Sequence, residues 1–444
     1  MANSEQAMPQ RKIFKRTPQF SQGKKCTALA VSILRHMKTP QTTVEESTQR
    51  ITRRYIKGSR PARVTRISIE STESNASKPR LKQGVHISQP DPEHEQSLVV
   101  ASAHRAISIN HPGARAIIAK FDGSHCALDI SSEIDAPLDV VEKVIKQLEI
   151  TQLLDITTSK IRLHNRFHSP IAERSAHTED QSNDASFKQL QLRMSPELSQ
   201  TTWVSGVVDG GVEVLSSRQN FGVEIHGENR LATLIYAALL ASGVTNTKFS
   251  IASDRDVTSI GDGDLGTGVL RISDFGLNYK SRIEELTREW SLFPTASKNV
   301  KGTVNSPIPE RNVRVIVGRY SPQLQEQLMR DRMDHLFVGS VFGGAAYAGP
   351  LVQPGKTPCA QCLEMGRAER YGITHLVPLA SHNREIPVAI SYQMAGTIVQ
   401  AILQLIDTGT CELTGAQMCF DYTTPVQQVP VRFSRHPQCQ CQWN

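Results

Sequence analysis

The stretch VEIHGENRLATLIYAALLASG, residues 223–243, decides the predicted fold. Its opening, Val223–His226, has the pattern of a short, mostly apolar strand. After a brief turn, apolar residues recur at helical spacing over Arg230–Ser242, and the chain then reaches Gly243, a residue type that commonly ends helices. A strand that runs through a short turn into a helix is the building unit of α/β folds with parallel sheets.

The same alternation continues on the C-terminal side of this unit. In chain order the patterns predict strand Lys248–Ala252, helix Leu277–Trp290, strand Val313–Val317, a helix capped by Ser321 with Pro322 at its first position, strand Leu336–Phe342 and a long helix between Pro387 and Gly409. Such alternation predicts an α/β fold class, a mainly parallel, Rossmann-type sheet wrapped by helices over residues 201–444.

A smaller domain is predicted on the N-terminal side, over residues 79–168. Its patterns are, in chain order, strands Gly84–Ile87 and Leu98–Val100, helix Ala114–Phe121, a helix that begins at Asp135 or Ala136, and a closing β-pair of residues 153–156 with 160–163. Strands, helices and a terminal hairpin in this order predict a winged helix-turn-helix. The polar residues 169–200 are predicted to be a linker.

Charge is distributed unevenly along the 444 residues, whose formal net charge is +7. Residues 1–90 hold 18 Lys and Arg against 5 Asp and Glu, a net of +13, so the rest of the chain carries −6. Residues 1–78 are polar and basic and lack apolar periodicity, which predicts a disordered tail.

A nucleic-acid partner is disfavoured despite this tail. The second helix of the predicted winged helix mixes acidic and basic residues, namely Glu142, Lys143, Lys146 and Glu149. Helices that read DNA usually present unopposed Arg, Lys, Asn or Gln. The sequence therefore favours a peptide-binding module, in which an extended segment adds to a strand edge and packs against a helix. Four residues in elements that would frame this groove are Val85, Ile87, Ile117 and Val144. A DNA-binding regulator is the alternative.

Membrane insertion and secretion are also disfavoured. No apolar run approaches the roughly 18–20 residues that a membrane span needs. The 8 cysteines in so long a chain do not form the pattern of a disulfide scaffold. We therefore expect a cytoplasmic protein without a membrane anchor.

Four of the cysteines form two close pairs, Cys359-Ala-Gln-Cys362 and Cys439-Gln-Cys441. Turns of this type direct both sulfurs toward one ion, and two such turns make a tetrathiolate zinc site. Four thiolates leave no open position, so the zinc is expected to be structural. A redox dithiol is the alternative, but it needs only one pair.

The turn between strand and helix, His226-Gly227-Glu228-Asn229-Arg230, lies where folds of this class bind a nucleotide phosphate. Only Gly227 is a glycine there, and Glu228 places negative charge near the phosphate position. After the next strand, Asp254 stands where such folds hold a ribose. No carboxylate follows Val317 to bind Mg²⁺, and no other catalytic set emerges. The sequence predicts a degenerate ATP site and no catalytic residues.

Several motifs resemble one family. Pro350-Leu351-Val352, Pro354-Gly355, Thr357-Pro358-Cys359 and the ending His436-Pro437-x-Cys439-x-Cys441-x-Trp443 are similar to ThiF-like proteins of peptide natural-product clusters. These proteins are described as bacteriocin-biosynthesis cyclodehydratase domains or leader-peptide-binding proteins of thiazole/oxazole-modified microcins. Further matches are Pro79-Arg80-Leu81-Lys82, Asp122-Gly123, Asp264-Leu265-Gly266-x-Gly268 and Asp274-x-Gly276. The resemblance covers residues 79–444.

The resemblance implies a precursor-recognition winged helix fused to a ThiF-like domain with a structural zinc. Such a protein binds the leader of a ribosomally made precursor peptide and presents it to a YcaO-type, ATP-dependent cyclodehydratase, which forms azolines and azoles. It is not itself expected to be catalytic. A homodimer is the default state for ThiF-like domains. The competing interpretation is an intact ThiF-like enzyme that uses ATP to adenylate the C-terminus of a peptide or carrier protein.

Overall fold

The computed structural model describes residues 77–89, 97–157, 159, 185–227, 229–250, 259–293, 311–318, 321–342, 345–371, 386–421 and 429–442. All of them belong to one compact unit, residues 71–444. The predicted tail 1–78 lies outside the described residues except for Ser77 and Lys78, and so does the predicted strand 160–163.

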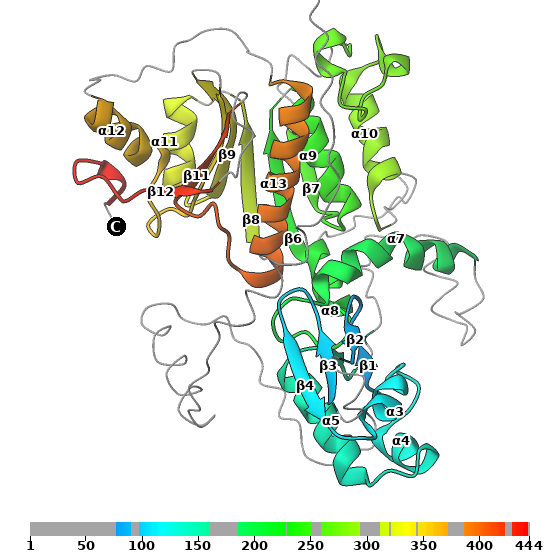
Figure 1. Cartoon of the computed structure of the whole chain (residues 1–444). Helices are drawn as coiled ribbons and strands as arrows, with labels where there is room; N and C mark the ends of the chain where they lie inside the picture. The colour runs from blue at the N-terminus through cyan, green and yellow to red at the C-terminus, as the bar shows by residue number, and fades with distance from the viewer. Residues whose placement is uncertain are drawn as a thin grey trace, which may run out of the picture. The chain divides into compact units, whose positions relative to one another are not determined.

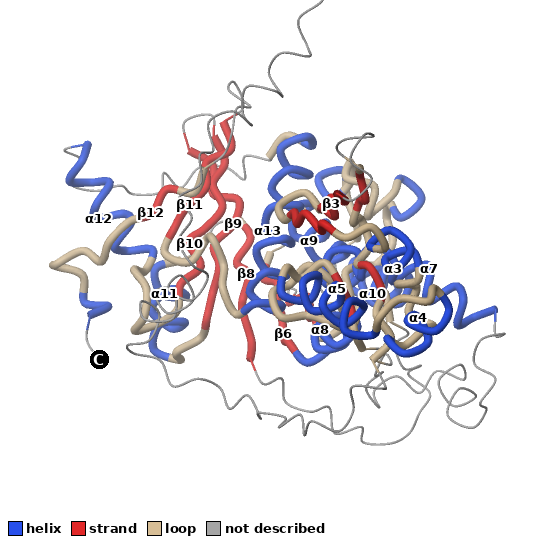
Figure 2. Tube along the Cα trace, turned by 60° about the horizontal axis from the view of Figure 1, so that its bottom comes forward, coloured by secondary structure: helices blue, strands red, loops and turns tan. Residues whose placement is uncertain are grey.

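A seven-stranded sheet forms the centre of the C-terminal domain (Figures 1 and 2), in the order β12-β11-β10-β9-β8-β6-β7. Its strands are β6 Phe221–His226, β7 Thr247–Ser250, β8 Arg311–Val317, β9 Asp334–Phe342, β10 Ala345–Val352, β11 Ala416–Asp421 and β12 Val431–Arg432. The β7-β6-β8-β9 half is parallel, as predicted. The β9-β10-β11-β12 half is antiparallel, which the sequence did not predict. Only residues 343 and 344 separate β9 from β10, and so short a connection allows antiparallel pairing alone.

Helices cover both faces of this sheet, as Figure 1 shows. On one face α9 (Arg230–Ala241) and α13 (Val388–Thr408) pack on β6 and β8, and α10 (Tyr279–Trp290) packs on α9. On the other face α11 (Pro322–Arg330) and α12 (Ala360–Tyr371) pack on Ile316 and Phe337. The alternation of side chains along β8 explains the two cores, because Val315 faces the first and Ile316 the second.

Among the described helices α13 is the one long and apolar enough to cross a membrane. Nine of its residues are buried, and they pack in the core with α9 and the sheet. It begins after Pro387 and ends at Gly409, which adopts the left-handed conformation that glycine tolerates best. We therefore describe α13 as a core helix of the α/β fold.

The N-terminal domain contains a three-stranded sheet, three helices and a separate pair of short strands. A three-stranded antiparallel sheet in the order β2-β3-β4 consists of His86–Ser88, Ser97–Ala101 and Ala106–Asn110. The helices are α3 Ala114–Ala119, α4 Ala127–Glu133 and α5 Leu138–Ile150, and they enclose one apolar core with the sheet. The sequence prediction omitted β4 and α4. β5 (Leu154–Asp155) pairs with β1 (Arg80–Leu81), which the sequence did not predict, and the predicted pairing of β5 with residues 160–163 lies outside the described residues.

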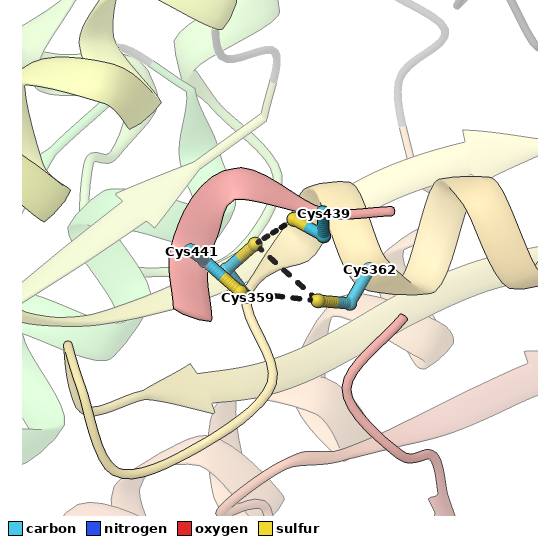
Figure 3. A group of neighbouring side chains, drawn as sticks. All are labelled: Cys359, Cys362, Cys439 and Cys441. Atoms are coloured by element: carbon cyan, nitrogen blue, oxygen red, sulfur yellow. Dashed lines mark hydrogen bonds between the residues drawn. The ribbon is translucent and has the colours of Figure 1, made fainter. Parts of the chain in front are cut away.

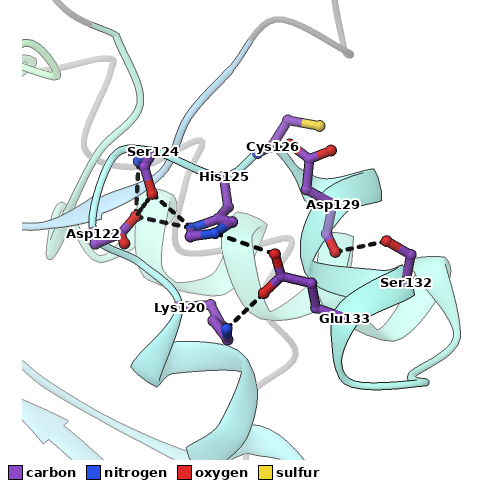
Figure 4. Close-up of polar contacts among 8 residues, drawn as sticks. All are labelled: Lys120, Asp122, Ser124, His125, Cys126, Asp129, Ser132 and Glu133. Atoms are coloured by element: carbon purple, nitrogen blue, oxygen red, sulfur yellow. Dashed lines mark hydrogen bonds and ion pairs between the residues drawn. The ribbon is translucent and has the colours of Figure 1, made fainter.

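A surface network of polar side chains joins α3 to α4 (Figure 4). Asp122 accepts hydrogen bonds from the backbone N–H and the hydroxyl of Ser124, at 2.7 and 2.6 Å. His125 lies between Asp122 and Glu133, at 3.1 and 3.3 Å, and Lys120 pairs with Glu133 at 2.5 Å. Hydrogen bonds from Ser124, followed by those from His125, hold the pKa of the Asp122 carboxyl well below its usual range. The Asp122-Gly123 motif is therefore the anchor of a turn.

The second half of the predicted linker is a helix. α7 spans Ala185–Thr201 and is followed by α8 (Val212–Ser217). Met194 of α7 is buried with Leu215, Leu292 and Phe293, so this helix packs on the C-terminal domain. The apolar residues of α7 are few, and its mostly polar composition hides the helix from a search for hydrophobic periodicity.

Two buried cations connect segments that are far apart in the sequence. Arg218 donates to both carboxylate oxygens of Asp407, at 2.9 and 2.7 Å, and to Glu197 at 2.6 Å. Lys82 donates to the backbone oxygens of Thr202 and Val207, at 2.5 and 2.6 Å. Asp155 lies 3.6 Å from the Lys82 ammonium and balances its charge. Lys82 thus ties the loop after α7 to the N-terminal domain.

Candidate functional sites

Four cysteines from two distant parts of the chain meet at one point (Figure 3). Cys359 lies just before α12 and Cys362 lies in its first turn, whereas Cys439 and Cys441 belong to the C-terminal segment around the turn Gln440–Gln442. The four sulfur atoms all lie within 4.8 Å of one another. The sulfurs of Cys362 and Cys441 are 3.3 Å apart, and Cys359 lies 3.6 Å from Cys439 and 3.8 Å from Cys362.

A zinc ion fits this arrangement. Zinc–sulfur bonds of about 2.3 Å place the corners of a tetrahedron about 3.8 Å apart, close to the separations found here. A disulfide requires about 2.05 Å between its sulfurs, and all four cysteines are free. The redox alternative needs one isolated pair, whereas here each pair lies against the other. The residues present therefore fit a closed tetrathiolate site of the structural type.

The electrostatics of the cluster also favour a cation. Burial raises the pKa of the Cys359 thiol, and the neighbouring sulfurs raise it further. Burial, with Cys362 alongside, raises the pKa of Cys441 to about 12. Four neighbouring thiolates, three of them buried, repel one another, and a divalent cation removes this cost because it pairs with all of them.

His436 supports the cluster from outside. Its ring is buried, and its Nδ1 accepts a hydrogen bond from the backbone N–H of Gln438 at 3.2 Å. The proton of a neutral ring is then on Nε2, which lies 2.8 Å from the carboxylate of Glu369 on α12. The backbone oxygen of His436 accepts from Cys439 N–H. These contacts hold the C-terminal segment against α12 and orient its two cysteines.

The nucleotide turn between β6 and α9 is the second site that the sequence singled out. A Cβ atom at Gly227 would meet Val317 at 2.8 Å, so only glycine allows the two strands' ends to approach this closely. Glu228 and Asp254 lie outside the described residues, and the predicted ribose contact stays a prediction.

The N-terminus of α9 is already occupied by protein groups. The side-chain oxygen of Asn229 accepts a hydrogen bond from Ala232 N–H at 2.9 Å, one of the donors that a bound phosphate would use. Arg230 donates to the backbone oxygen of Ile386 at 3.2 Å. Asn229 and Arg230 thus cap and anchor the helix where phosphate-binding turns usually have glycine, and the degenerate ATP site stays a prediction.

The four residues predicted to frame a peptide groove divide into two groups. Ile117 and Val144 are buried in the core of the N-terminal domain, so their side chains do not reach the surface where a peptide would bind. Val85 is half-buried against the same core, and Ile87 is 44% exposed on β2. The structure does not bring them together on one surface.

The free edge of β4 is a feature that the sequence prediction missed. Ser102 N–H donates to Arg105 O at 2.7 Å, which makes residues 102 and 105 a hydrogen-bonded pair of the β3–β4 hairpin. Hydrogen-bonded pairs alternate along an antiparallel ladder, so the backbone groups of Ala106, Ser108 and Asn110 point away from β3. Their side chains are small or polar and exposed, and β4 has no second neighbour among the described strands. An extended peptide could pair there.

The described residues form a ThiF-like α/β fold with a small N-terminal domain. Similar solved structures are those of E. coli MccB. MccB with AMPCPP and MccA has a TM-score of 0.55 at 14% identity, and MccB with ATP has 0.55 at 13%. MccB, the microcin C7 biosynthetic enzyme, in complex with N-formylated MccA has 0.54 at 14%. In each case the match covers 82% of this chain and 99% of MccB.

At such identities the likeness shows a shared fold. No family model matches the sequence, and no curated protein is similar to it. Because the match covers almost the whole of MccB, it includes both the N-terminal and the C-terminal domain of the described chain. The ThiF-like prediction is confirmed at the level of the fold.

Proposed function

We propose that this protein is a scaffold that binds the leader of a ribosomally made precursor peptide and presents it to a YcaO-type cyclodehydratase for azoline and azole formation. The observation that carries the proposal is the edge of β4, whose outward backbone groups offer a template for an extended peptide. The winged helix-turn-helix assignment of the N-terminal domain belongs to this proposal. MccB has a similar fold and was crystallised with the peptide MccA, which supports a peptide as the ligand.

The proposed scaffold is not catalytic. Asn229 and Arg230 occupy the helix terminus that would bind phosphate, which favours this interpretation over an adenylating enzyme. The zinc holds the C-terminal segment in place and takes no part in a reaction. A homodimer and a cytoplasmic location accompany the proposal as predictions.

The first test removes one outward hydrogen-bond donor from the edge of β4. Ser108→Pro deletes an N–H that does not bond to β3, so the hairpin should persist while peptide binding falls by about tenfold or more. Ser108→Ala keeps the N–H and is the matched control. Binding of a labelled precursor encoded beside this gene, measured by fluorescence anisotropy on the full chain, gives the comparison. Equal affinities of the two variants would contradict pairing at this edge.

The second test separates the scaffold from the adenylating alternative. ATP–pyrophosphate exchange with a candidate peptide should stay at background, because the phosphate position at α9 is taken by the Asn229 cap. Robust exchange that is lost in Asp254→Ala would establish the enzyme instead. Asn229→Ala should lower the free energy of unfolding by about 1 kcal/mol because the helix cap is lost. ATP–pyrophosphate exchange should stay at background in this variant too.

A further inference from the structure

A shallow groove opens beside the free edge of β4. It is lined by the tip of the β3–β4 hairpin and by the end of α5, namely His104, Arg105, Ala106, Ile150, Thr151 and Gln152, and has a volume of about 490 Å³. Ile150 is the last residue of α5 and is 72% exposed, although it is a large apolar side chain. The groove therefore combines a cationic side with an uncovered aliphatic side.

Arg105 stands in this groove without a counter-ion among the described residues. Its Nη1 is buried and has no hydrogen-bond partner, and no ion pair joins its guanidinium to a carboxylate of the described residues. The two carboxylates that act on the adjacent Lys82 are already engaged. Asp155 pairs with Lys82 itself, and Asp209 accepts from the backbone N–H groups of Gly211 and Glu213.

The position of Arg105 is costly for the free protein. Burial and repulsion by Arg105 together lower the pKa of Lys82, although Asp155 acts in the opposite direction. A partly buried guanidinium beside a second cation loses hydration without gaining a partner. Such a cost is offset when a ligand brings an anionic group into the groove.

We propose that Arg105 binds the side-chain carboxylate of an Asp or Glu in the peptide, while a neighbouring aliphatic side chain of that peptide packs on Ile150. The inference rests on the proposed function, because it names what the peptide at the β4 edge must contain. Arg105 directly precedes Ala106, the first of the outward-facing residues of β4. The acidic residue therefore falls at the end of the paired segment, where the peptide leaves the sheet.

A display library of random 12-residue peptides, selected on the full-length protein, tests the proposal and identifies its own ligands. Peptides selected by the natural protein should be enriched in Asp or Glu next to Leu, Ile or Val. Arg105→Glu should lose this enrichment and select Lys or Arg at the same position. Arg115→Glu makes the same change of charge on an exposed site of α3 outside the groove, and it should select the same peptides as the natural protein.

Binding and stability together distinguish a ligand-binding arginine from a structural one. Arg105→Gln should weaken a selected acidic peptide about 10- to 100-fold, and a Gln-substituted version of that peptide should no longer distinguish the two proteins. The melting temperature should not fall, because no described residue gives Nη1 a hydrogen bond that could be lost. A clear fall in melting temperature with unchanged peptide affinity would overturn the proposal.

Other outcomes separate this inference from the function on which it rests. Peptides that bind in a Ser108→Pro-sensitive manner but show no acidic preference would refute the role of Arg105 and leave the scaffold function standing. Binding that disappears when the peptide C-terminus is amidated would assign the site to a terminal carboxylate and also refute it. Failure to select any peptide would count against the scaffold function itself, and this inference would fall with it.

Discussion

Replacing Cys362 with serine should remove the bound metal and loosen the C-terminal segment. Cys362 is 2% exposed, and its sulfur lies 3.3 Å from that of Cys441 and 3.8 Å from that of Cys359, so no other described side chain can take its place. Metal analysis of the purified natural protein should give about one zinc per chain, and the variant should give almost none. Because metal binding stabilises only the folded state, the melting temperature should fall with the zinc content.

Cys419→Ser is the matched control for this experiment. Cys419 is an exposed cysteine on β11 outside the cluster, so its loss should change neither zinc content nor melting temperature. Limited proteolysis should cut the Cys362→Ser protein near residues 429–442 before it cuts the control. A natural protein that is purified free of metal and is as stable as the zinc-loaded one would rule out the structural role.

Replacing Arg218 with methionine should destabilise the chain by about 3–5 kcal/mol, because it leaves buried carboxylates without their cation. The side chain of Arg218 is 0% exposed, and that of Asp407 is only 4% exposed. Arg218 also bonds to the backbone oxygen of Ser242. The melting temperature should therefore fall by about 10 °C, and peptide affinity should be retained below the transition.

Arg330→Ala provides the comparison for Arg218→Met. Arg330 pairs with Glu326 on the exposed surface of α11, and pairs of this kind contribute about 0–1 kcal/mol. The double variant Arg218→Met, Asp407→Asn should recover part of the loss, since it removes the unpaired charge. If Arg218→Met melts at the same temperature as Arg330→Ala, the buried network contributes far less than its geometry indicates.

The parallel half of the large sheet and the meeting of the four cysteines were the parts best predicted from the sequence. β6, β8 and the start of α9 follow from local patterns, because a buried strand next to an amphipathic helix leaves a clear signal within a few residues. The close spacing within each cysteine pair likewise predicts that the two pairs meet. The antiparallel half was missed because the direction in which a strand runs depends on its connections. Two helices separate β10 from β11 in the sequence, so local patterns do not reveal that these strands pair.

The N-terminal domain shows what local patterns cannot supply. β4 has the alternating pattern Ala-Ile-Ser-Ile-Asn and was available to sequence reasoning, but it is short and mostly exposed. The edge that β4 forms depends on which strands pair, and the lack of a described partner for Arg105 Nη1 depends on which carboxylates are already engaged. Those are properties of the assembled domain. The Asp254 prediction lies in residues 251–258, which the structure does not describe.

The hydrogen bonds of Lys82 determine which fragments of this protein can be expected to fold. Its ammonium is held by carbonyl groups of Thr202 and Val207, and Ile156 N–H donates to Val208 O, so a loop that follows α7 completes the N-terminal domain. A fragment that stops at residue 168 would expose the buried Lys82 ammonium and lack both of these carbonyl acceptors. A transfer of the N-terminal domain to another protein therefore has to include two separate segments, residues 79–157 and residues 201–211.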